Sequence, residues 1–277
     1  NAALKLTLTL QPLSYKVDLE QLDRRSAGTV WNLDPVNDWL AGPERALCVV
    51  ADAGTGKSTI SAALVREFLG RPVAGTPGAW VGPISAVHFL KHSDQRRLDP
   101  VAIVKSIVFQ IARRVPRLQE TLFGARLVPR QVMSLRSVDE ACALLLPLVV
   151  AACAGETVVL LLDALDEADP PEQQRADYDR SSGCVAPAGN KALHLVVAHL
   201  SKLPPNFRLI VTTRPDAVLG DVMSTLSRTF GGSLRRVSPH ELRLDCKMAQ
   251  SRREKKRRRV VGGGGGGAGG GAGGGAG

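Results

Sequence analysis

The sequence predicts an α/β protein with an open, mostly parallel central sheet and helices on both of its faces. Strand-like and helix-like segments alternate from about residue 46 to about residue 230. The segment Thr157–Leu162 (TVVLLL) is an apolar run without polar alternation, which is typical of a strand buried on both faces of a parallel sheet. Ligands of such folds lie beyond the carboxyl ends of the strands, so we expect the functional residues at that edge.

Five segments are predicted to be strands. Four of them are short, mostly apolar runs. The fifth is weaker, because polar residues interrupt it. The predicted strands are Leu47–Val50, Ser85–Leu90, Thr157–Leu162, Arg208–Thr212 and a segment near Leu234–Leu244.

Helices are predicted between these strands. Apolar residues at helical spacing predict helices over Lys57–Leu69 and Asn190–Leu203. Asp99 followed by Pro100 is a helix start, and Pro116 is expected to stop that helix.

A third helix is expected to begin at a capping box. Ser137 and Glu140 are three residues apart, the spacing at which the side chain of each accepts a hydrogen bond from the backbone amide of the other. Pro147 lies inside the apolar run that follows, and we expect it to kink or divide this helix.

The two ends of the chain are set apart from the predicted domain. Residues 1–27 form a lead segment, residues 28–246 the domain and residues 247–277 a tail. In the lead segment the alternation of leucine with polar residues favours a half-buried strand, although it indicates no neighbour in the sheet. The alternating residues are Leu4, Leu6, Leu8 and Leu10. The polar segment Asp169–Gly189 is rich in turn formers and is expected to be a long surface loop.

The positive charge of the chain is concentrated in the tail. The net charge is +10, and Ser251–Val261 (SRREKKRRRVV) contributes +6 of it, which leaves +4 for all the other residues. Only Gly and Ala follow, so the tail is expected to be disordered. The basic segment can bind nucleic acid or acidic protein, act as a nuclear import signal, or be solvated without a specific partner. No aromatic residue follows Phe230, and the tail therefore has no platform for stacking bases.

Composition argues against membrane insertion and against a disulfide framework. The longest apolar stretch, Ala141–Ala154, contains a proline and is shorter than the about 20 residues that a bilayer span requires. No cysteine pair has the C-x-x-C spacing of a metal or redox site, and three cysteines lie in apolar runs. We expect a cytoplasmic protein with reduced cysteines and no membrane contact, and the basic tail leaves a nuclear location open.

A glycine-rich motif lies between the first predicted strand and the helix that follows it. Ala51–Thr59 reads ADAGTGKST, which fits the phosphate-loop pattern G-x-x-x-x-G-K-[ST] except that Ala51 replaces the leading glycine. A helix N-terminus offers free amides to phosphate, the lysine neutralises phosphate charge and the serine hydroxyl binds Mg²⁺. The alternative is an ordinary glycine-rich turn with a surface lysine. The nucleotide-binding residues predicted here are Asp52, Ala53, Gly54, Thr55, Gly56, Lys57, Ser58 and Thr59, with Ser58 also on the metal.

Acidic residues follow the most apolar strand. Asp163 stands at the strand end, where an aspartate can hold Mg²⁺ through water. Asp166 and Glu167 come a turn later, and both are candidates to orient or deprotonate the attacking water. The alternative is a set of acids that simply favour the start of a helix.

One arginine completes the predicted site residues, and a pair of histidines is not included among them. Arg214 ends the next strand, where it can contact a γ-phosphate, or else it is a surface residue before Pro215. His88 and His92 lie near Asp94, but their spacing straddles a strand end and provides no fourth ligand, so a metal site there is disfavoured.

The order of these motifs resembles the NACHT branch of the STAND P-loop NTPases. The matching segments, which run from about residue 28 to residue 228, are GTVWNLDPVNDWL, ADAGTGKST, HFLKHSD, LLLDALDEAD and LIVTTRPD. The resemblance implies a P-loop NTPase three-layer sandwich in which the Arg214 strand lies between the phosphate-loop strand and the Asp163 strand. It also implies ATP, or less often GTP, with Mg²⁺, and a switch that oligomerises in the triphosphate state and carries effector domains. The helical and winged-helix parts that clamp the nucleotide in that family are not recognisable here.

The leading hypothesis is therefore a nucleotide-binding signalling switch with slow Mg²⁺-dependent hydrolysis, in which Asp166, Glu167 and Arg214 are catalytic and Asp163 holds the metal. Two alternatives are a nonhydrolysing scaffold that recruits partners and a nucleic-acid-dependent ATPase that uses the basic tail. The partners expected are the nucleotide, a second copy of the chain or an effector protein, with nucleic acid weakly supported.

Overall fold

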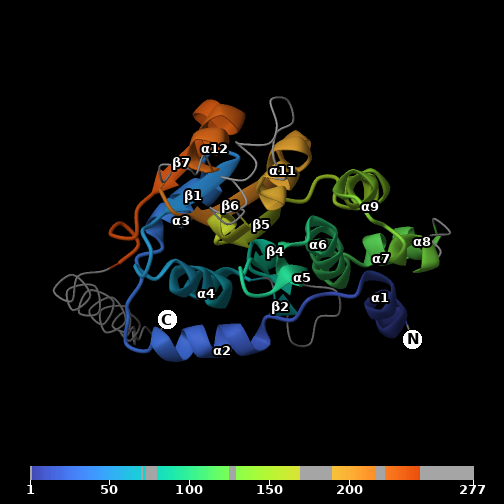
Figure 1. Cartoon of the computed structure of the whole chain (residues 1–277), viewed down its shortest axis with the longest axis horizontal. Helices are drawn as coiled ribbons and strands as arrows, with labels where there is room; N and C mark the ends of the chain where they lie inside the picture. Colours follow the sequence, from blue (N-terminus) through green and yellow to red (C-terminus); the bar gives the residue numbers. More distant parts are fainter. Residues whose placement is uncertain are drawn as a thin grey trace, which may run out of the picture.

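The computed structural model describes residues 2–69, 71–72, 80–124, 129–168, 189–215 and 222–243, and its centre is a five-stranded sheet (Figure 1). The strand order is β4-β5-β6-β1-β7, and every neighbouring pair is parallel. The strands are β1 (Ala46–Val50), β4 (Ile84–Phe89), β5 (Val158–Asp163), β6 (Phe207–Thr213) and β7 (Leu234–Val237). The predicted α/β class and all five predicted strands are confirmed, and β6 lies between β1 and β5, as the resemblance implied.

Each inner strand buries side chains on both faces of the sheet. Leu160 belongs to the core on one face and Leu161 to the core on the other. This two-sided burial is the physical reason for the unbroken apolar run in β5, since no position on the strand faces water.

The helices on one face of the sheet come from the N-terminal part of the chain. They are α2 (Lys16–Arg25), α3 (Asp34–Ala41) and α4 (Lys57–Phe68). Ile60 and Leu64 of α4 pack with Trp39 of α3 against the sheet. Figure 1 shows α2 alongside α4.

The opposite face carries a larger helical layer. Val108, Leu145 and Val196 come from three different helices and share one core with the sheet. The helices of this layer are α1 (Ala2–Leu10), α6 (Pro100–Arg114), α7 (Pro116–Gly124), α8 (Pro129–Met133), α9 (Val138–Ala152), α11 (Lys191–Ala198) and α12 (Val222–Phe230). Shorter elements are α5 (Gln95–Leu98), the 3₁₀ turns η1 (Leu165–Ala168), η2 (Leu200–Lys202) and η3 (Gly231–Ser233), and the antiparallel pair β2 (Arg71–Pro72) and β3 (Trp80–Val81).

The predicted helix ends agree with the structure, with two exceptions. The Asp99 carboxylate caps α6 by accepting from the Val101 amide at 3.0 Å, and Ser137 and Glu140 form the capping box of α9. Pro147 does not divide α9, which continues through it to Ala152. The helix predicted over 190–203 is shorter than expected, because α11 ends at residue 198 and a separate 3₁₀ turn follows.

The N-terminal segment is a helix, and the strand predicted there is wrong. Leu6 and Leu10 are buried, whereas Leu4 and Leu8 are 59% and 61% exposed. Residues four apart share one face of a helix, so a leucine at every second position also produces an apolar helical face. The buried face of α1 packs against α6 and α8.

Two predictions fall on residues outside the described ranges. They are residues 169–188 of the surface loop predicted over Asp169–Gly189, and the basic, glycine-rich tail. Among the described residues, no helix combines the length and the apolar character that a membrane crossing needs.

Candidate functional site

The glycine-rich loop connects β1 to α4 at the carboxyl edge of the sheet. Gly54 and Gly56 have φ values of +77° and +91°, in the region that favours glycine, and Gly56 is the residue before the first turn of α4. The Thr55 amide and hydroxyl donate to the Asp52 carbonyl at 3.3 and 2.7 Å, which closes the turn. The amides at the start of α4 are therefore presented beside a tightly curled backbone, the arrangement that binds anions at helix N-termini.

Lys57 is folded back over this loop. Its ammonium group donates to the carbonyl oxygens of Ala51 and Asp52 at 3.0 and 3.4 Å, and only 9% of the residue is exposed. Burial lowers the pKa of Lys57; the Asp166 carboxylate raises it and Arg214 lowers it. The predicted phosphate-binding lysine thus lies within electrostatic reach of the groups predicted around it.

Asp163, at the end of β5, is buried among hydroxyl groups. Its Oδ1 accepts from Ser61 Oγ at 2.5 Å and from Thr212 Oγ1 at 2.6 Å. Burial raises the pKa of Asp163, while the hydroxyls of Ser61, Thr212 and Ser58 lower it. The structure therefore brings together Ser58 and Asp163, the two residues proposed to hold a metal, and adds the hydroxyl groups of Ser61 and Thr212, which no sequence motif indicates.

The chain turns sharply after Asp163. Ala164 has a φ of +57°, which is uncommon for a residue with a side chain, and its amide donates to Thr212 Oγ1 at 2.8 Å. This turn leads into η1, which carries Asp166 and Glu167.

The two acidic residues of η1 have different partners. Asp166 accepts from the Arg214 side chain at 2.9 Å and from the Arg214 amide at 3.1 Å. Glu167 instead accepts from the His92 amide at 2.7 Å, which links η1 to the segment after β4. The sequence does not distinguish these two residues, but their hydrogen-bond partners in the structure do.

A further arginine reaches the loop from the other end of the described chain. Arg243 Nη2 donates to the Thr55 carbonyl at 2.6 Å, and its guanidinium lies 5.9 Å from the ring centre of Trp31. Arg243 follows β7 and lies in no recognisable motif, so the sequence carried no signal for it.

His88 does not belong to a metal site. Its Nε2 lies 2.8 Å from the Arg97 carbonyl and its Nδ1 lies 2.6 Å from the Tyr15 hydroxyl. A carbonyl only accepts, so Nε2 donates and Nδ1 accepts from the tyrosine. Burial lowers the pKa of His88 to about 4.

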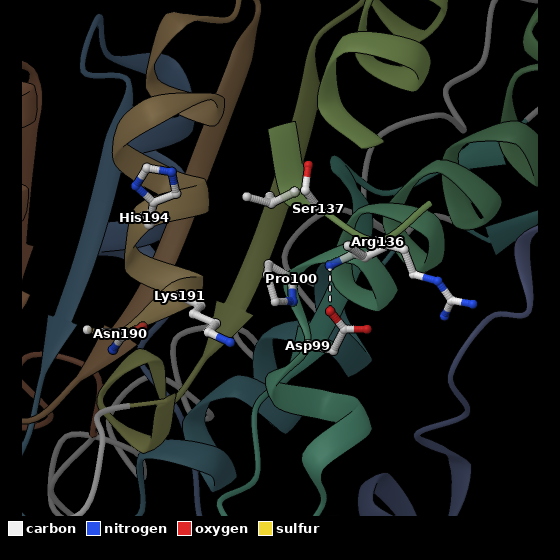
Figure 2. A pocket seen from close by; sticks show the side chains of 10 residues that line it. Asp99, Pro100, Arg136, Ser137, Asn190, Lys191 and His194 are labelled. Atoms are coloured by element: carbon white, nitrogen blue, oxygen red, sulfur yellow. Dashed lines mark hydrogen bonds between the residues drawn. The ribbon is translucent and has the colours of Figure 1, made fainter. Parts of the chain in front are cut away.

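A cavity of about 480 Å³ lies away from the phosphate-loop motif, among the N-terminal ends of three helices (Figure 2). Asp99, Ser137 and Asn190, the capping residues of α6, α9 and α11, all line it. The Asn190 amide also donates to the Leu165 carbonyl of η1 at 2.7 Å. None of the predicted site residues lines this cavity.

The parallel sheet, with a glycine-rich loop between β1 and α4, is that of a P-loop-type α/β domain. A family model described as "Nephrocystin 3, N-terminal" matches residues 28–214, about two thirds of the chain. The chain belongs to this family. A search of curated proteins finds no match to the chain.

Proposed function

We propose that this protein is a nucleotide-binding P-loop NTPase of the NACHT type, a signalling switch that hydrolyses ATP, or GTP, slowly with Mg²⁺. The observation that carries the proposal is the convergence of three neighbouring strands. The carboxyl ends of β1, β6 and β5 are followed by the glycine-rich loop with Lys57, by Arg214 and by the acidic turn η1. This is the edge at which α/β folds bind ligands.

Phosphate binding is assigned to the loop and to Lys57. The amides at the start of α4 would bind a β-phosphate, and the Lys57 ammonium would exchange its two carbonyl acceptors for phosphate oxygens. A charged acceptor makes a stronger hydrogen bond than a neutral carbonyl, which favours that exchange.

The side chains around Asp163 fit Mg²⁺. This ion prefers oxygen ligands, usually retains several waters and is commonly held by one carboxylate. Here a buried carboxylate is surrounded by hydroxyl oxygens. One of them belongs to Ser58, which follows Lys57 in the first turn of α4. When bound, Mg²⁺ would neutralise phosphate charge, while Ser58 and Asp163 hold it in place.

Asp166, Glu167 and Arg214 are assigned to the terminal phosphate. Arg214 is 51% exposed at its side chain, so it can leave Asp166 and contact a γ-phosphate. The carboxylate that it leaves, or that of Glu167, would then orient the attacking water.

Calorimetry with MgATP and MgGTP tests nucleotide binding on the full chain. Lys57→Ala should abolish binding, and Lys202→Ala, which removes an exposed lysine from η2, should leave it unchanged. Thermal unfolding without nucleotide checks that both variants fold. Equal affinity of Lys57→Ala and the parent chain would refute the proposal.

A nonhydrolysing nucleotide-bound scaffold is a second candidate, favoured by a specific observation. Both acidic side chains of η1 already have protein partners, Arg214 and the His92 amide. Single-turnover hydrolysis separates the two functions. A switch should lose hydrolysis in Glu167→Gln, or in Asp166→Asn, whereas a scaffold would show no difference from the parent.

A further inference from the structure

We infer that Asp139, His194 and His199 form a binding site for a divalent transition metal of the zinc class, which joins the start of α9 to the end of α11. The site is separate from the proposed nucleotide site, and it does not depend on that proposal.

The three side chains come from two helices that are distant in sequence and meet in space. Asp139 lies in the first turn of α9, His194 lies within α11 and His199 is the residue that caps the C-terminus of α11. Asp139 Oδ1 lies 2.7 Å from His199 Nε2 and 4.0 Å from His194 Nε2. All three potential ligand atoms lie within 4.8 Å of one another.

These separations are close to those of a tetrahedral metal site. Ligand atoms at 2.0–2.1 Å from zinc are about 3.3 Å apart. The oxygen and the His199 nitrogen would move slightly apart, and the His194 nitrogen would move inward. The His194 side chain is 57% exposed and the Asp139 side chain 72% exposed, so small side-chain rotations accomplish this without repacking the core.

The orientation of the rings also suits a shared ligand. The two imidazole planes are 85° apart with centroids 6.0 Å apart, so both rings can direct a nitrogen to one point from different sides. The third ligand approaches from α9, and the fourth position stays open to water.

The ligand chemistry selects the metal. Two imidazole nitrogens and one carboxylate suit zinc, nickel or copper, whereas magnesium and calcium prefer oxygen alone. The carboxylate offsets half of the ion's charge. His199 stands at the C-terminal end of α11, where the helix dipole favours a cation.

With the metal bound, α11 would be held at both of its ends. The start of α11 is already held to η1 by the bond from the Asn190 side chain to the Leu165 carbonyl. The metal would hold the other end to α9. The competing explanation is that His199 and Asp139 merely share a hydrogen bond.

Titration of the chelator-treated full chain with ZnCl₂, followed by calorimetry in the absence of nucleotide, distinguishes the two explanations. We expect one site in the parent and at least a tenfold loss of affinity in each of His194→Ala, His199→Ala and Asp139→Asn. His240→Ala is the matched control, because it removes an exposed histidine elsewhere and should bind as the parent does. Cobalt(II) should give visible bands without thiolate charge-transfer absorption, which separates this site from binding at cysteines.

Zinc should also raise the melting temperature of the parent but not that of His194→Ala. This variant loses a mostly exposed side chain and keeps the His199–Asp139 bond, so it is expected to fold. Equal zinc affinity in the parent and His194→Ala, or no zinc binding by the parent, would overturn the inference and leave only the hydrogen bond.

Discussion

The Thr212 hydroxyl links Asp163 to the turn that follows it, and Thr212→Val should lower the free energy of unfolding. The Thr212 hydroxyl donates to Asp163 Oδ1 at 2.6 Å and accepts from the Ala164 amide at 2.8 Å, and the residue is fully buried. Valine keeps the shape of threonine but removes both hydrogen bonds.

The expected loss follows from these two bonds. A buried donor or acceptor that is left unsatisfied costs about 1–3 kcal/mol. Thr212→Val leaves the Ala164 amide without this acceptor and takes one of the donors from Asp163. We therefore expect the free energy of unfolding to fall by about 3 kcal/mol, a large part of the roughly 5–15 kcal/mol that stabilises a typical domain.

Urea denaturation of the parent and the variant measures this difference. Thr213→Val is the matched control, because Thr213 is also buried but its hydroxyl makes one longer bond, at 3.2 Å, to the Arg214 carbonyl. The control should lose about 1 kcal/mol. If Thr212→Val cost no more than Thr213→Val, the hydroxyl would not hold Asp163 and the turn as described.

Two further predictions concern stability. His88 is neutral in the folded state, with a pKa lowered by burial to about 4, whereas an exposed histidine titrates near about 6.5. The free energy of unfolding should thus fall by about 3 kcal/mol as the pH drops from about 6.5 toward 4. In urea unfolding, His88→Gln should remove that part of the pH dependence, and parallel pH profiles of the variant and the parent would contradict the prediction. Gly56→Ala should lower the free energy of unfolding by about 1–2 kcal/mol, because alanine disfavours the left-handed backbone at this position. The loss should be larger than that backbone contribution alone, because the new methyl group would lie 3.2 Å from the Arg243 guanidinium. Gly28→Ala, with a φ of +87° and open space around it, is the control that measures the backbone cost alone; a smaller loss in Gly56→Ala than in Gly28→Ala would be inconsistent with this packing.

The sequence predicted the sheet well because burial on two faces leaves a local signature. The run in β5 contains no polar residue until Asp163, and the glycine-rich loop after β1 combines a motif with the expected strand and helix. Local patterns of this kind need no knowledge of distant contacts. The prediction for the N-terminal segment was wrong because it rested on a local pattern alone. Leucines at alternate positions are compatible with a strand or with a helix, and the surface against which they pack decides between the two.

Contacts between distant residues were beyond the sequence. Ser61 lies one turn after Ser58 on α4, yet only the position of β5 shows that its hydroxyl meets Asp163. Likewise, Asp166 and Glu167 are adjacent and chemically alike, and their different partners depend on how η1 sits between β6 and the segment after β4. Asp139 and the histidines of α11 belong to helices whose pairing no local pattern encodes.

The bond from Arg243 to the Thr55 carbonyl has a mechanical consequence. It joins the segment that follows β7 to the loop before α4, across 188 positions of sequence. A displacement of the backbone at Arg243 therefore pulls on Thr55 and on the left-handed glycine beside it, unless the bond breaks first. The conformation of the loop is in this way coupled, through one side chain, to the segment that follows the edge strand β7.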